Sequence, residues 1–273
     1  MVGIQISSLK ELDNLTKTVD ILQIEAIQLF FSSPLDWVQK NIFHMQSIFA
    51  SLKKYNGVKR IIIHAPQSQN LDGQTRKIRI QRWKILREKL TFCSFLGVDG
   101  YVVHLQYPLS YPLDMLIAEA DQSLYDLVTK VPLILENTVT QGRFGNKLSS
   151  MEQFMIHLNP IINTEICLDS AHLFASGYHF EDKERANQLK HKFPQLFQKT
   201  SLVHVNDSKT PFQSNQDWHE NIGKGYIGLG AIGAFLSLFD KDNIFILETP
   251  KQNFDDFIQN VITLKKLIDG NSK

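Results

Sequence analysis

The sequence predicts an α/β fold, a single (β/α)8 barrel over residues 1–273, and three observations indicate this class. Eight short runs rich in Val, Ile and Leu recur along the chain, longer stretches with helical spacing separate them, and 273 residues suffice for one such barrel. Continuous apolar runs are typical of parallel strands that are buried on both faces. Alternating strands and helices form right-handed βαβ units, and eight of these units close into a TIM barrel.

The predicted elements follow one another in a regular order. We expect helices where apolar residues recur at helical spacing, and four such stretches lie at 35–54, 73–97, 113–130 and 180–199. A Gly-rich stretch at 223–233 lacks a GxGxxG motif after a strand, so we interpret it as a flexible rim loop that leads into a helix. The eight predicted strands are 2–7, 24–31, 60–65, 100–105, 131–137, 165–170, 201–207 and 244–250.

The composition is that of a globular protein, with 43% hydrophobic and 21% charged residues. No apolar run reaches the roughly 18 residues of a membrane span, and the N-terminus lacks the order of a signal peptide, so we expect a cytoplasmic or other intracellular protein without a membrane partner. A net charge of +1 argues against coating nucleic acid by bulk electrostatics. We interpret the basic segments 53–60 and 75–84 as solvated helix faces, with a stripe that contacts phosphate as the alternative. Cys93 and Cys167 lie in apolar segments, which favours core thiols over a disulfide.

Six consecutive predicted strands, the third to the eighth, end in a side chain that can bind a metal ion. The C-terminal ends of barrel strands converge on one face, where the active sites of this architecture lie. We therefore expect the six side chains to line one pocket. They are His64, His104, Glu136, Asp169, His204 and Glu248.

Three further ligand candidates follow these strand ends closely. His172 lies three residues after Asp169, while Asp217 and His219 are two residues apart, which places both side chains on the same side of an extended segment. The nine candidates supply imidazole and carboxylate without thiolate, a set that suits catalytic zinc and also manganese or iron. Nine ligands exceed the need of one ion and indicate a cluster of two or three ions with a bridging carboxylate.

Each candidate alone has an ordinary structural explanation. A histidine at a strand end is more often a hydrogen-bonded pocket residue than a ligand, and Glu136 alone could be an exposed turn carboxylate. Six such residues at the same end of six successive strands, however, would crowd unpaired charge into one low-dielectric site. The metal interpretation removes this conflict.

Several motifs are highly specific. The longest are LILENTVTQG, EICLDSAHLFASGY and LVHVNDSKTPFQSNQDWHENIGKGYIGLGAI, followed by IFILETP and, more weakly, IIIHAP and YVVHL. In these stretches the chain resembles the endonuclease IV family, the zinc-dependent apurinic/apyrimidinic (AP) endonucleases of base-excision repair. The resemblance covers nearly the whole chain and implies a xylose isomerase-like TIM barrel with three zinc ions.

The resemblance also implies a role for each candidate ligand. All nine ligands of the family's site have a chemically identical residue here, which argues against a degenerate, non-catalytic homologue. The implied groups are His64 and His104 on the first zinc, Asp169, His204 and Glu248 on the second, Glu136 bridging these two, and His172, Asp217 and His219 on the third.

The implied activity is hydrolysis of the phosphodiester 5′ to an abasic site in DNA. This reaction is slow without a catalyst, because an anionic phosphate repels hydroxide and the alkoxide is a poor leaving group. Metal ions address both difficulties by lowering the pKa of water and by neutralising the phosphoryl and leaving oxygens. We expect Glu136, with Glu248 as a second candidate, to orient the attacking hydroxide.

Four residues that flank the ligands are candidates for supporting roles. Their side chains would either orient the ligands or meet phosphate. Asp207 and Lys209 could equally pair with each other in a rim salt bridge, and both interpretations stay open. The four residues are Asn137, Asn206, Asp207 and Lys209.

The sequence departs from the family in the loops that distort DNA. Family members push an Arg and a bulky Tyr-Leu pair into the duplex, but the corresponding positions here are Leu35, Gln67 and Ser68. Small polar side chains fill little of the gap that opens when bases unstack. Tyr107, within the altered stretch 105–108, and Trp218 also replace family residues. We interpret both as packed rim aromatics, with stacking on a base or sugar as the alternative.

Three other functions stay open. The altered loops permit a phosphodiesterase for single-stranded nucleic acid, a small phosphodiester or a sugar phosphate. Related barrels with one or two ions are sugar isomerases or epimerases, although a His-rich set of nine ligands favours hydrolysis. A non-catalytic binding module is least favoured because the ligands are intact. One barrel would hold the whole site, so a monomer would suffice.

Overall fold

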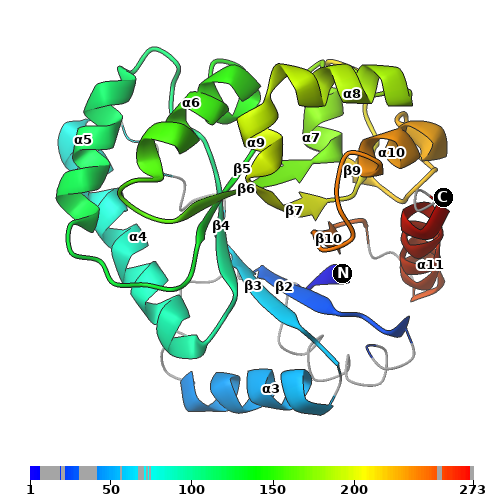
Figure 1. The fold of residues 1–273 in the computed structure, drawn as a ribbon, viewed down its shortest axis with the longest axis horizontal. Coiled ribbons are helices and arrows are strands. Elements are labelled where there is room, and N and C mark those ends of the chain that lie inside the picture. Colours follow the sequence, from blue (N-terminus) through cyan, green and yellow to red (C-terminus); the bar gives the residue numbers. More distant parts are fainter. Residues whose placement is uncertain are drawn as a thin grey trace.

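The computed structural model describes residues 1–6, 19, 22–30, 42–55, 57–66, 71, 73, 75–250 and 254–270. Its central feature is a closed barrel of eight parallel strands, which confirms the predicted α/β barrel (Figure 1). The strands are β1 (Val2–Ile6), β2 (Ala26–Phe30), β3 (Arg60–His64), β4 (Gly100–His104), β5 (Leu133–Glu136), β6 (Thr164–Asp169), β7 (Thr200–His204) and β10 (Ile244–Leu247). They are ordered β1-β10-β7-β6-β5-β4-β3-β2, so each strand pairs with its neighbour in the chain and β10 closes the barrel against β1.

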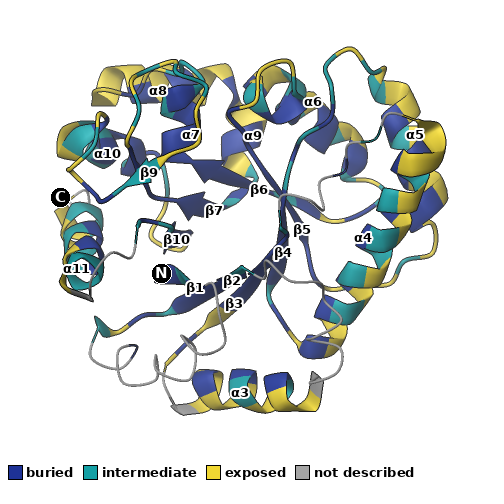
Figure 2. Ribbon diagram, turned by 180° about the vertical axis from the view of Figure 1, so that it is seen from behind, coloured by how far each residue is buried: buried dark blue, intermediate teal, exposed yellow. Residues whose placement is uncertain are grey.

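Helices form a ring around the strands, with buried faces toward the barrel and exposed faces toward solvent (Figures 1 and 2). None of the helices in the described part of the chain is long and apolar enough to cross a membrane. The helices are α3 (Ile42–Tyr55), α4 (Arg76–Leu96), α5 (Leu113–Leu124), the 3-10 helix η2 (Phe144–Asn146), α6 (Leu148–Leu158), α7 (Ser170–Ala175), α8 (Lys183–Lys192), α9 (Pro194–Gln198), α10 (Gly228–Leu236) and α11 (Phe254–Gly270).

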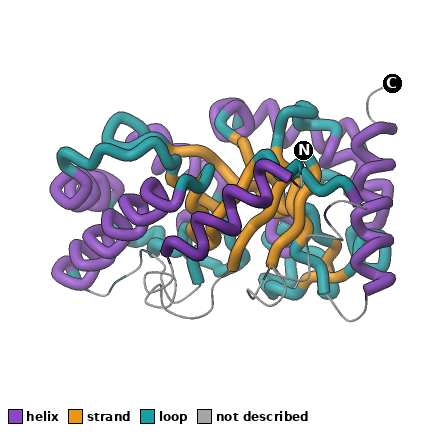
Figure 3. Tube along the Cα trace, turned by 90° about the horizontal axis from the view of Figure 1, so that it is seen from below, coloured by secondary structure: helices purple, strands orange, loops and turns teal. Residues whose placement is uncertain are grey.

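The hydrophobic core has two parts, one between the strands and the helices and one inside the barrel. Figure 3 shows from the side how the helices enclose the strands. Cys93 belongs to the outer part and Cys167 to the inner part, and both are buried and free of disulfides, as expected. The inner cluster consists of Ala26, Ile62, Val102, Ile134, Cys167, Leu202, Ile244 and Ile246, with Met1 packed against it. This apolar cluster fills the interior below the C-terminal ends of the strands.

Several predicted boundaries are wrong for identifiable reasons. The predicted helix 180–199 is two helices, because Pro194 starts α9 and the residue before a proline avoids helical geometry; Phe193 has φ −131° and ψ 59°. The predicted helix 113–130 ends at Leu124, since Tyr125 leaves helical geometry with φ −48° and ψ 135° and Asp126 adopts φ 60°. The Gly-rich stretch 223–233 is a loop only up to 227, because α10 begins at Gly228.

The seventh predicted strand, 201–207, is also shorter than expected. β7 ends at His204, and Asp207 belongs to a separate strand, β8 (Asp207–Ser208), which pairs antiparallel with β9 (His219–Glu220). The carbonyl oxygen of Trp218 accepts the N–H of Lys209 at 2.8 Å beside this pair. The β8–β9 pair therefore returns the chain segment with Asp217 and His219 to the C-terminal end of the barrel.

Candidate metal centre

The six candidate ligands at the strand ends form one layer inside the barrel. Each lies two residues after a member of the inner apolar cluster, as His64 does after Ile62 and Glu136 after Ile134. Successive residues of a strand alternate between its faces, so each ligand points toward the barrel axis one layer above that cluster. Across β4 and β5, His104 is the register partner of Glu136.

Glu136 occupies the centre of this layer and is fully buried. Its Oε2 lies 2.8 Å from His64 Nε2 and 3.0 Å from His104 Nε2, while its Oε1 lies 2.9 Å from His204 Nδ1. Burial opposes the charged carboxylate, but His104, His204 and His64 outweigh burial and hold the pKa of Glu136 well below its ordinary value. Glu136 is thus an anion that three imidazoles share.

A second group lies beside it and contains His172, Asp217 and His219. Asp217 Oδ1 is 3.1 Å from His172 Nε2 and 3.2 Å from His219 Nε2. Both Nε2 atoms are buried, yet neither makes a hydrogen bond within the described structure. Buried polar atoms without a partner are rare, and two imidazole nitrogens that face one carboxylate oxygen in this way fit a metal ion.

The donor atoms fall into overlapping sets, in each of which all ligand atoms lie within 4.8 Å of one another. Cys167 also lies in one such set, but burial raises the pKa of its thiol well above the ordinary value, which disfavours the thiolate that a metal requires. The residues therefore fit divalent ions through nitrogen and oxygen donors. The sets without Cys167 are His64, His104 and Glu136; His64, His204 and Glu248; Glu136, Asp169, His204 and Glu248; and Asp169, His172 and His219.

Asn137 and Asn206, two of the four predicted supporting residues, are buried and contact candidate ligands. Asn206 Nδ2 donates to Asp169 Oδ2 at 2.6 Å, and its Oδ1 accepts from the Glu248 N–H at 2.9 Å. Asn137 Oδ1 accepts the Asp169 N–H at 2.7 Å, and the backbone carbonyl oxygen of Asn137 lies 2.9 Å from His172 Nδ1. Each asparagine links two candidate ligands from different elements.

Asp207 and Lys209, the other two, lie differently. Asp207 is fully buried and accepts backbone N–H groups from the following loop: Gly223 at 2.9 Å, Gly225 at 3.1 Å and Ile227 at 2.9 Å. Lys209 is exposed and makes no ion pair within the described residues. Asp207 therefore makes no ion pair with Lys209, and its carboxylate fixes the loop that we expect from the sequence to be flexible.

The two altered aromatic residues have opposite environments. Tyr107 is fully buried, 6.1 Å from the Trp83 ring and 5.7 Å from the Phe154 ring between centroids, so it is a core residue and cannot stack on a substrate. Trp218 is 59% exposed, which contradicts the expectation of a packed ring. The altered positions Leu35, Gln67 and Ser68 lie outside the described residues.

Most described residues of the two basic segments are exposed, as the interpretation as solvated faces predicts, and several of their side chains also make ion pairs. Lys53 and Arg60 approach Asp99 at 2.8 and 3.6 Å. Arg79 is only 2% exposed and makes a bidentate pair with Glu119, with both contacts at 2.9 Å. These contacts connect neighbouring elements of the barrel.

Sequence reasoning missed one residue of the ligand layer, Gln28. It is fully buried in β2, and its amide contacts His204 and Glu248. The available signal was a single glutamine inside the apolar run IEAIQLFF. A polar side chain in the middle of a buried strand requires a partner.

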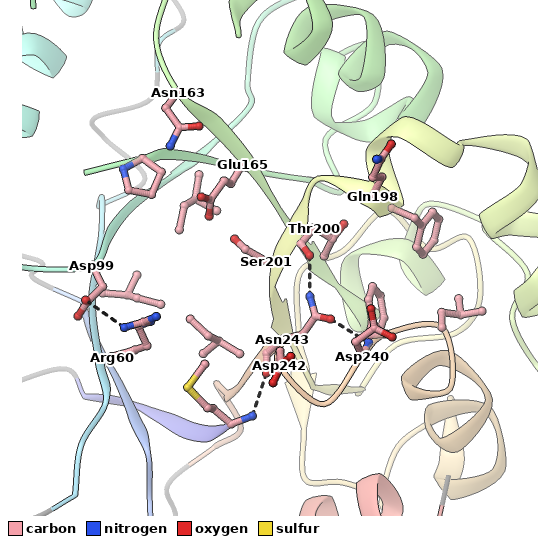
Figure 4. A pocket seen from close by; sticks show the side chains of 18 of the residues that line it. Arg60, Asp99, Asn163, Glu165, Gln198, Thr200, Ser201, Asp240, Asp242 and Asn243 are labelled. Atoms are coloured by element: carbon pink, nitrogen blue, oxygen red, sulfur yellow. Dashed lines mark hydrogen bonds and ion pairs between the residues drawn. The ribbon is translucent and has the colours of Figure 1, made fainter. Parts of the chain in front are cut away.

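A cavity of about 1310 Å³ opens at the opposite, N-terminal end of the barrel (Figure 4). Its lining includes Arg60 and Thr200, the first residues of their strands, and Glu165 near the start of β6. None of the nine candidate ligands lines it. This cavity is therefore separate from the candidate metal centre.

Fold and site together define an α/β barrel with a candidate metal centre at the C-terminal ends of its strands. The profile of the xylose isomerase-like TIM barrel family matches residues 22–267. The probable endonuclease 4 of Sulfurihydrogenibium sp. (strain YO3AOP1) is 31% identical, over 98% of this chain and 99% of that protein. The chain belongs to the endonuclease IV family of xylose isomerase-like TIM barrels.

Three further comparisons, with one relative and two solved structures, agree with this assignment of family and fold. The apurinic-apyrimidinic endonuclease 1 of Saccharomyces cerevisiae is 26% identical, over 90% of this chain and 70% of that protein. The crystal structure of endonuclease IV from Thermus thermophilus superposes with a TM-score of 0.75 at 21% identity, covering 98% and 99% of the two chains. A D-tagatose 3-epimerase-like protein gives a TM-score of 0.73 at 19% identity, covering 99% and 98%. At these identities, the two superpositions indicate a shared fold only.

Proposed function

We propose that the protein is a metal-dependent AP endonuclease that hydrolyses the phosphodiester 5′ to an abasic site in DNA, as a step of base-excision repair. The observation that carries this proposal is the gathering of nine imidazole and carboxylate donors at the C-terminal end of one barrel. The names of the relatives, endonuclease 4 and apurinic-apyrimidinic endonuclease 1, support the same reaction. All nine donors belong to one chain, so a monomer suffices.

The donor sets would hold two or three divalent ions, and their composition suits zinc, with manganese or iron as alternatives. When bound, such ions acidify water, neutralise the phosphoryl oxygens and stabilise the departing 3′ oxygen. The proposed ligands are His64 and His104 for one ion, Asp169, His204 and Glu248 for the next, Glu136 between these two, and His172, Asp217 and His219 for the third.

The protein's own contribution to the reaction centres on Glu136 and Glu248. Three imidazoles keep the pKa of Glu136 low, so the carboxylate stays ionised although it is fully buried. An ionised, rigid carboxylate accepts a hydrogen bond from the attacking hydroxide. This hydrogen bond orients the hydroxide so that a lone pair of the hydroxide oxygen points toward phosphorus. Glu248, whose Oε2 is 3.2 Å from His204 Nδ1, is the second candidate for this role.

The proposal is tested by strand cleavage on matched duplexes with and without one synthetic abasic site. The protein is purified without chelator, and its metal content is determined in the same sample. We expect incision 5′ to the abasic site and a loss of roughly 100-fold or more in Glu136→Gln, which keeps the shape of the side chain but removes its charge. Glu165→Gln makes the same change at the opposite end of the barrel (Figure 4), and we expect it to cleave normally.

Each other outcome has a defined meaning. Near-normal cleavage by Glu136→Gln would contradict the role of that carboxylate. No incision despite two or three bound ions would contradict the abasic substrate and direct the search to single-stranded nucleic acid, small phosphodiesters and sugar phosphates. Retained binding of duplex DNA without any turnover would favour a binding module. The epimerase-like neighbour supports no separate proposal, because it shares only the fold.

A further inference from the structure

Gln28 belongs to the ligand layer although its strand carries no candidate ligand. It lies two residues after Ala26, a member of the inner apolar cluster, and it is fully buried. Its Oε1 lies 2.9 Å from His204 Nε2, and its Nε2 donates to Glu248 Oε1 at 2.6 Å and to Gln5 Oε1 at 2.8 Å. The amide thus uses its acceptor and both of its donor hydrogens.

The orientation of this amide follows from its neighbours. If the amide were turned over, its carbonyl oxygen would face the carboxylate of Glu248, and neither group has a hydrogen to donate. Only with Nε2 toward Glu248 does Gln28 satisfy that contact. Its Oε1 then faces His204, so the imidazole donates from Nε2.

In the neutral imidazole that a metal ligand requires, a proton on Nε2 leaves Nδ1 of His204 with the lone pair that binds the ion. This Nδ1 is 2.9 Å from Glu136 Oε1 and 3.2 Å from Glu248 Oε2, within the largest set of donors. The hydrogen bond from Gln28 likewise engages Oε1 of Glu248 and leaves Oε2 on the side of this donor set.

In two other histidines of the centre, a hydrogen bond also fixes one ring nitrogen and leaves the other free for a metal ion. In these two rings the fixed nitrogen is Nδ1 and the free nitrogen is Nε2. His64 Nδ1 lies 2.7 Å from the carbonyl oxygen of Ala65, and His172 Nδ1 lies 2.9 Å from that of Asn137. Both rings therefore present Nε2 to the other donors. His204 differs because the acceptor of its Nε2–H is a side-chain amide and not a backbone carbonyl.

We propose that Gln28 is a positioning residue of the metal centre, which selects the Nδ1-ligating tautomer of His204 and directs Oε2 of Glu248 to the same ion. A neutral amide does this without adding charge to a layer that already contains Glu136, Asp169 and Glu248. The inference rests on the metal centre of the proposed function and is independent of the DNA substrate.

The test compares zinc affinity in the full chain, by competition with a chromophoric chelator, between the wild type, Gln28→Leu and Asn243→Leu. Asn243 is a matched control at the N-terminal end of the barrel, where its Nδ2 donates to the Thr200 carbonyl at 2.6 Å and its Oδ1 accepts from the Asp240 N–H at 2.9 Å (Figure 4). We expect Gln28→Leu to weaken one zinc site by roughly 10- to 100-fold and Asn243→Leu to leave all sites within about 3-fold. Equal losses in both variants, or no loss in Gln28→Leu, would overturn the proposal.

A second measurement on the wild type does not depend on the folding of Gln28→Leu. In zinc-loaded, ¹⁵N-labelled protein, two-bond ¹H–¹⁵N correlations identify the protonated and the metal-bound nitrogen of each imidazole. We expect His204 to carry its proton on Nε2 and to bind through Nδ1, and the opposite assignment would overturn the proposal. Because neither measurement uses DNA, inactivity on abasic duplexes would contradict the proposed function and leave this result unaffected.

Discussion

At the scale of single residues, Trp218 is a large exposed side chain that lies between two candidate ligands in the sequence. It separates Asp217 from His219, and 59% of its surface is exposed. The N–H of Lys209 donates to its carbonyl oxygen, so the backbone is held while the indole faces solvent. An exposed indole beside a nucleic-acid cleavage site suits stacking on an unpaired base or on a sugar.

We therefore expect Trp218→Ala to raise KM for an abasic duplex by about 5- to 150-fold, which corresponds to the roughly 1–3 kcal/mol of one stacked base. The value of kcat should change less, because the neighbouring ligands remain. Steady-state kinetics with metal analysis distinguishes this effect from damage to the centre. Tyr125→Ala is the control, since Tyr125 is 75% exposed but lies after α5, on the chain segment that enters the barrel at the N-terminal end of β5. Unchanged KM in Trp218→Ala would contradict the stacking role.

The sequence reveals the candidate ligands more readily than it reveals the residues that position them. His64 and Glu136 were predictable because six successive apolar runs each end in an imidazole or carboxylate side chain, and the C-terminal ends of barrel strands converge on one face. Gln28 was not, since its partners His204 and Glu248 lie 176 and 220 residues away in the chain. Only the closed barrel brings these three strands together, and a glutamine alone gives no sign of which groups it will meet.

At the scale of elements, Asp207 joins the β8–β9 pair to the loop before α10. Its carboxylate accepts N–H groups from the loop, and a Cβ at Gly225 would collide with the Ser208 carbonyl oxygen and with the Asp207 carboxylate. A buried anion surrounded by backbone N–H donors is strongly favoured. The loop and the pair that ends in His219 are therefore held as one unit.

Asp207→Asn should disrupt this unit, because an amide replaces one acceptor oxygen by an NH2 group that faces N–H donors. We expect a loss of about 2–3 kcal/mol in the free energy of unfolding, the usual cost of buried unsatisfied donors, measured by urea denaturation. Asp182→Asn is the control: Asp182 caps α8, accepts the Arg185 N–H at 2.8 Å and is exposed, and asparagine caps a helix equally well. Equal stability of the two variants would contradict the role of Asp207.

The strands were predictable and several connections were not, for a physical reason. Continuous apolar runs mark strands that are buried on both faces, and each of the eight predicted runs overlaps a barrel strand. The β8–β9 pair consists of two polar residues on each side, so it has no apolar period. The position of the β8–β9 pair depends on the contacts of Asp207 and on the end of the barrel beneath the pair. The local sequence encodes neither of these. The break before Pro194, in contrast, is encoded locally, because a proline disfavours helical geometry in the residue before it.

At the scale of the whole molecule, the barrel brings several carboxylates and imidazoles together at one buried site. Without metal ions, the carboxylates raise the pKa of the neighbouring imidazoles. Burial lowers the pKa of His204, but Glu248 and Glu136 outweigh it and raise the pKa to about 9. Burial also lowers the pKa of His219, and Asp169 and Asp217 raise it to about 9. In the unfolded chain a histidine titrates near pH 6.5. The metal-free fold is therefore stabilised by protonated imidazoles, whereas metal binding requires neutral ones.

The sign of the pH dependence follows from these values. Below pH 6.5 both histidines are protonated in the folded and unfolded chains, so their contribution is fully present. Between pH 6.5 and about 9 the folded chain binds more protons, and this contribution, on the order of a few kcal/mol, is lost. We expect the urea midpoint in chelator to fall across this range. In zinc-saturated protein it should rise or stay level, because protons no longer compete with the ions.

Urea unfolding between pH 6.5 and 9, with chelator and with saturating zinc, measures both trends on the same protein. His219→Gln is the informative variant, since it removes one of the imidazoles whose pKa is raised and should give a shallower fall in chelator. A chelated midpoint that stays level or rises with pH would mean that the imidazoles are neutral in the metal-free fold. The layer would then be a preformed set of donors with unprotonated imidazoles, and metal binding would release few protons. Opposite trends in the two samples would instead show that the carboxylates hold protons on the imidazoles until an ion replaces them.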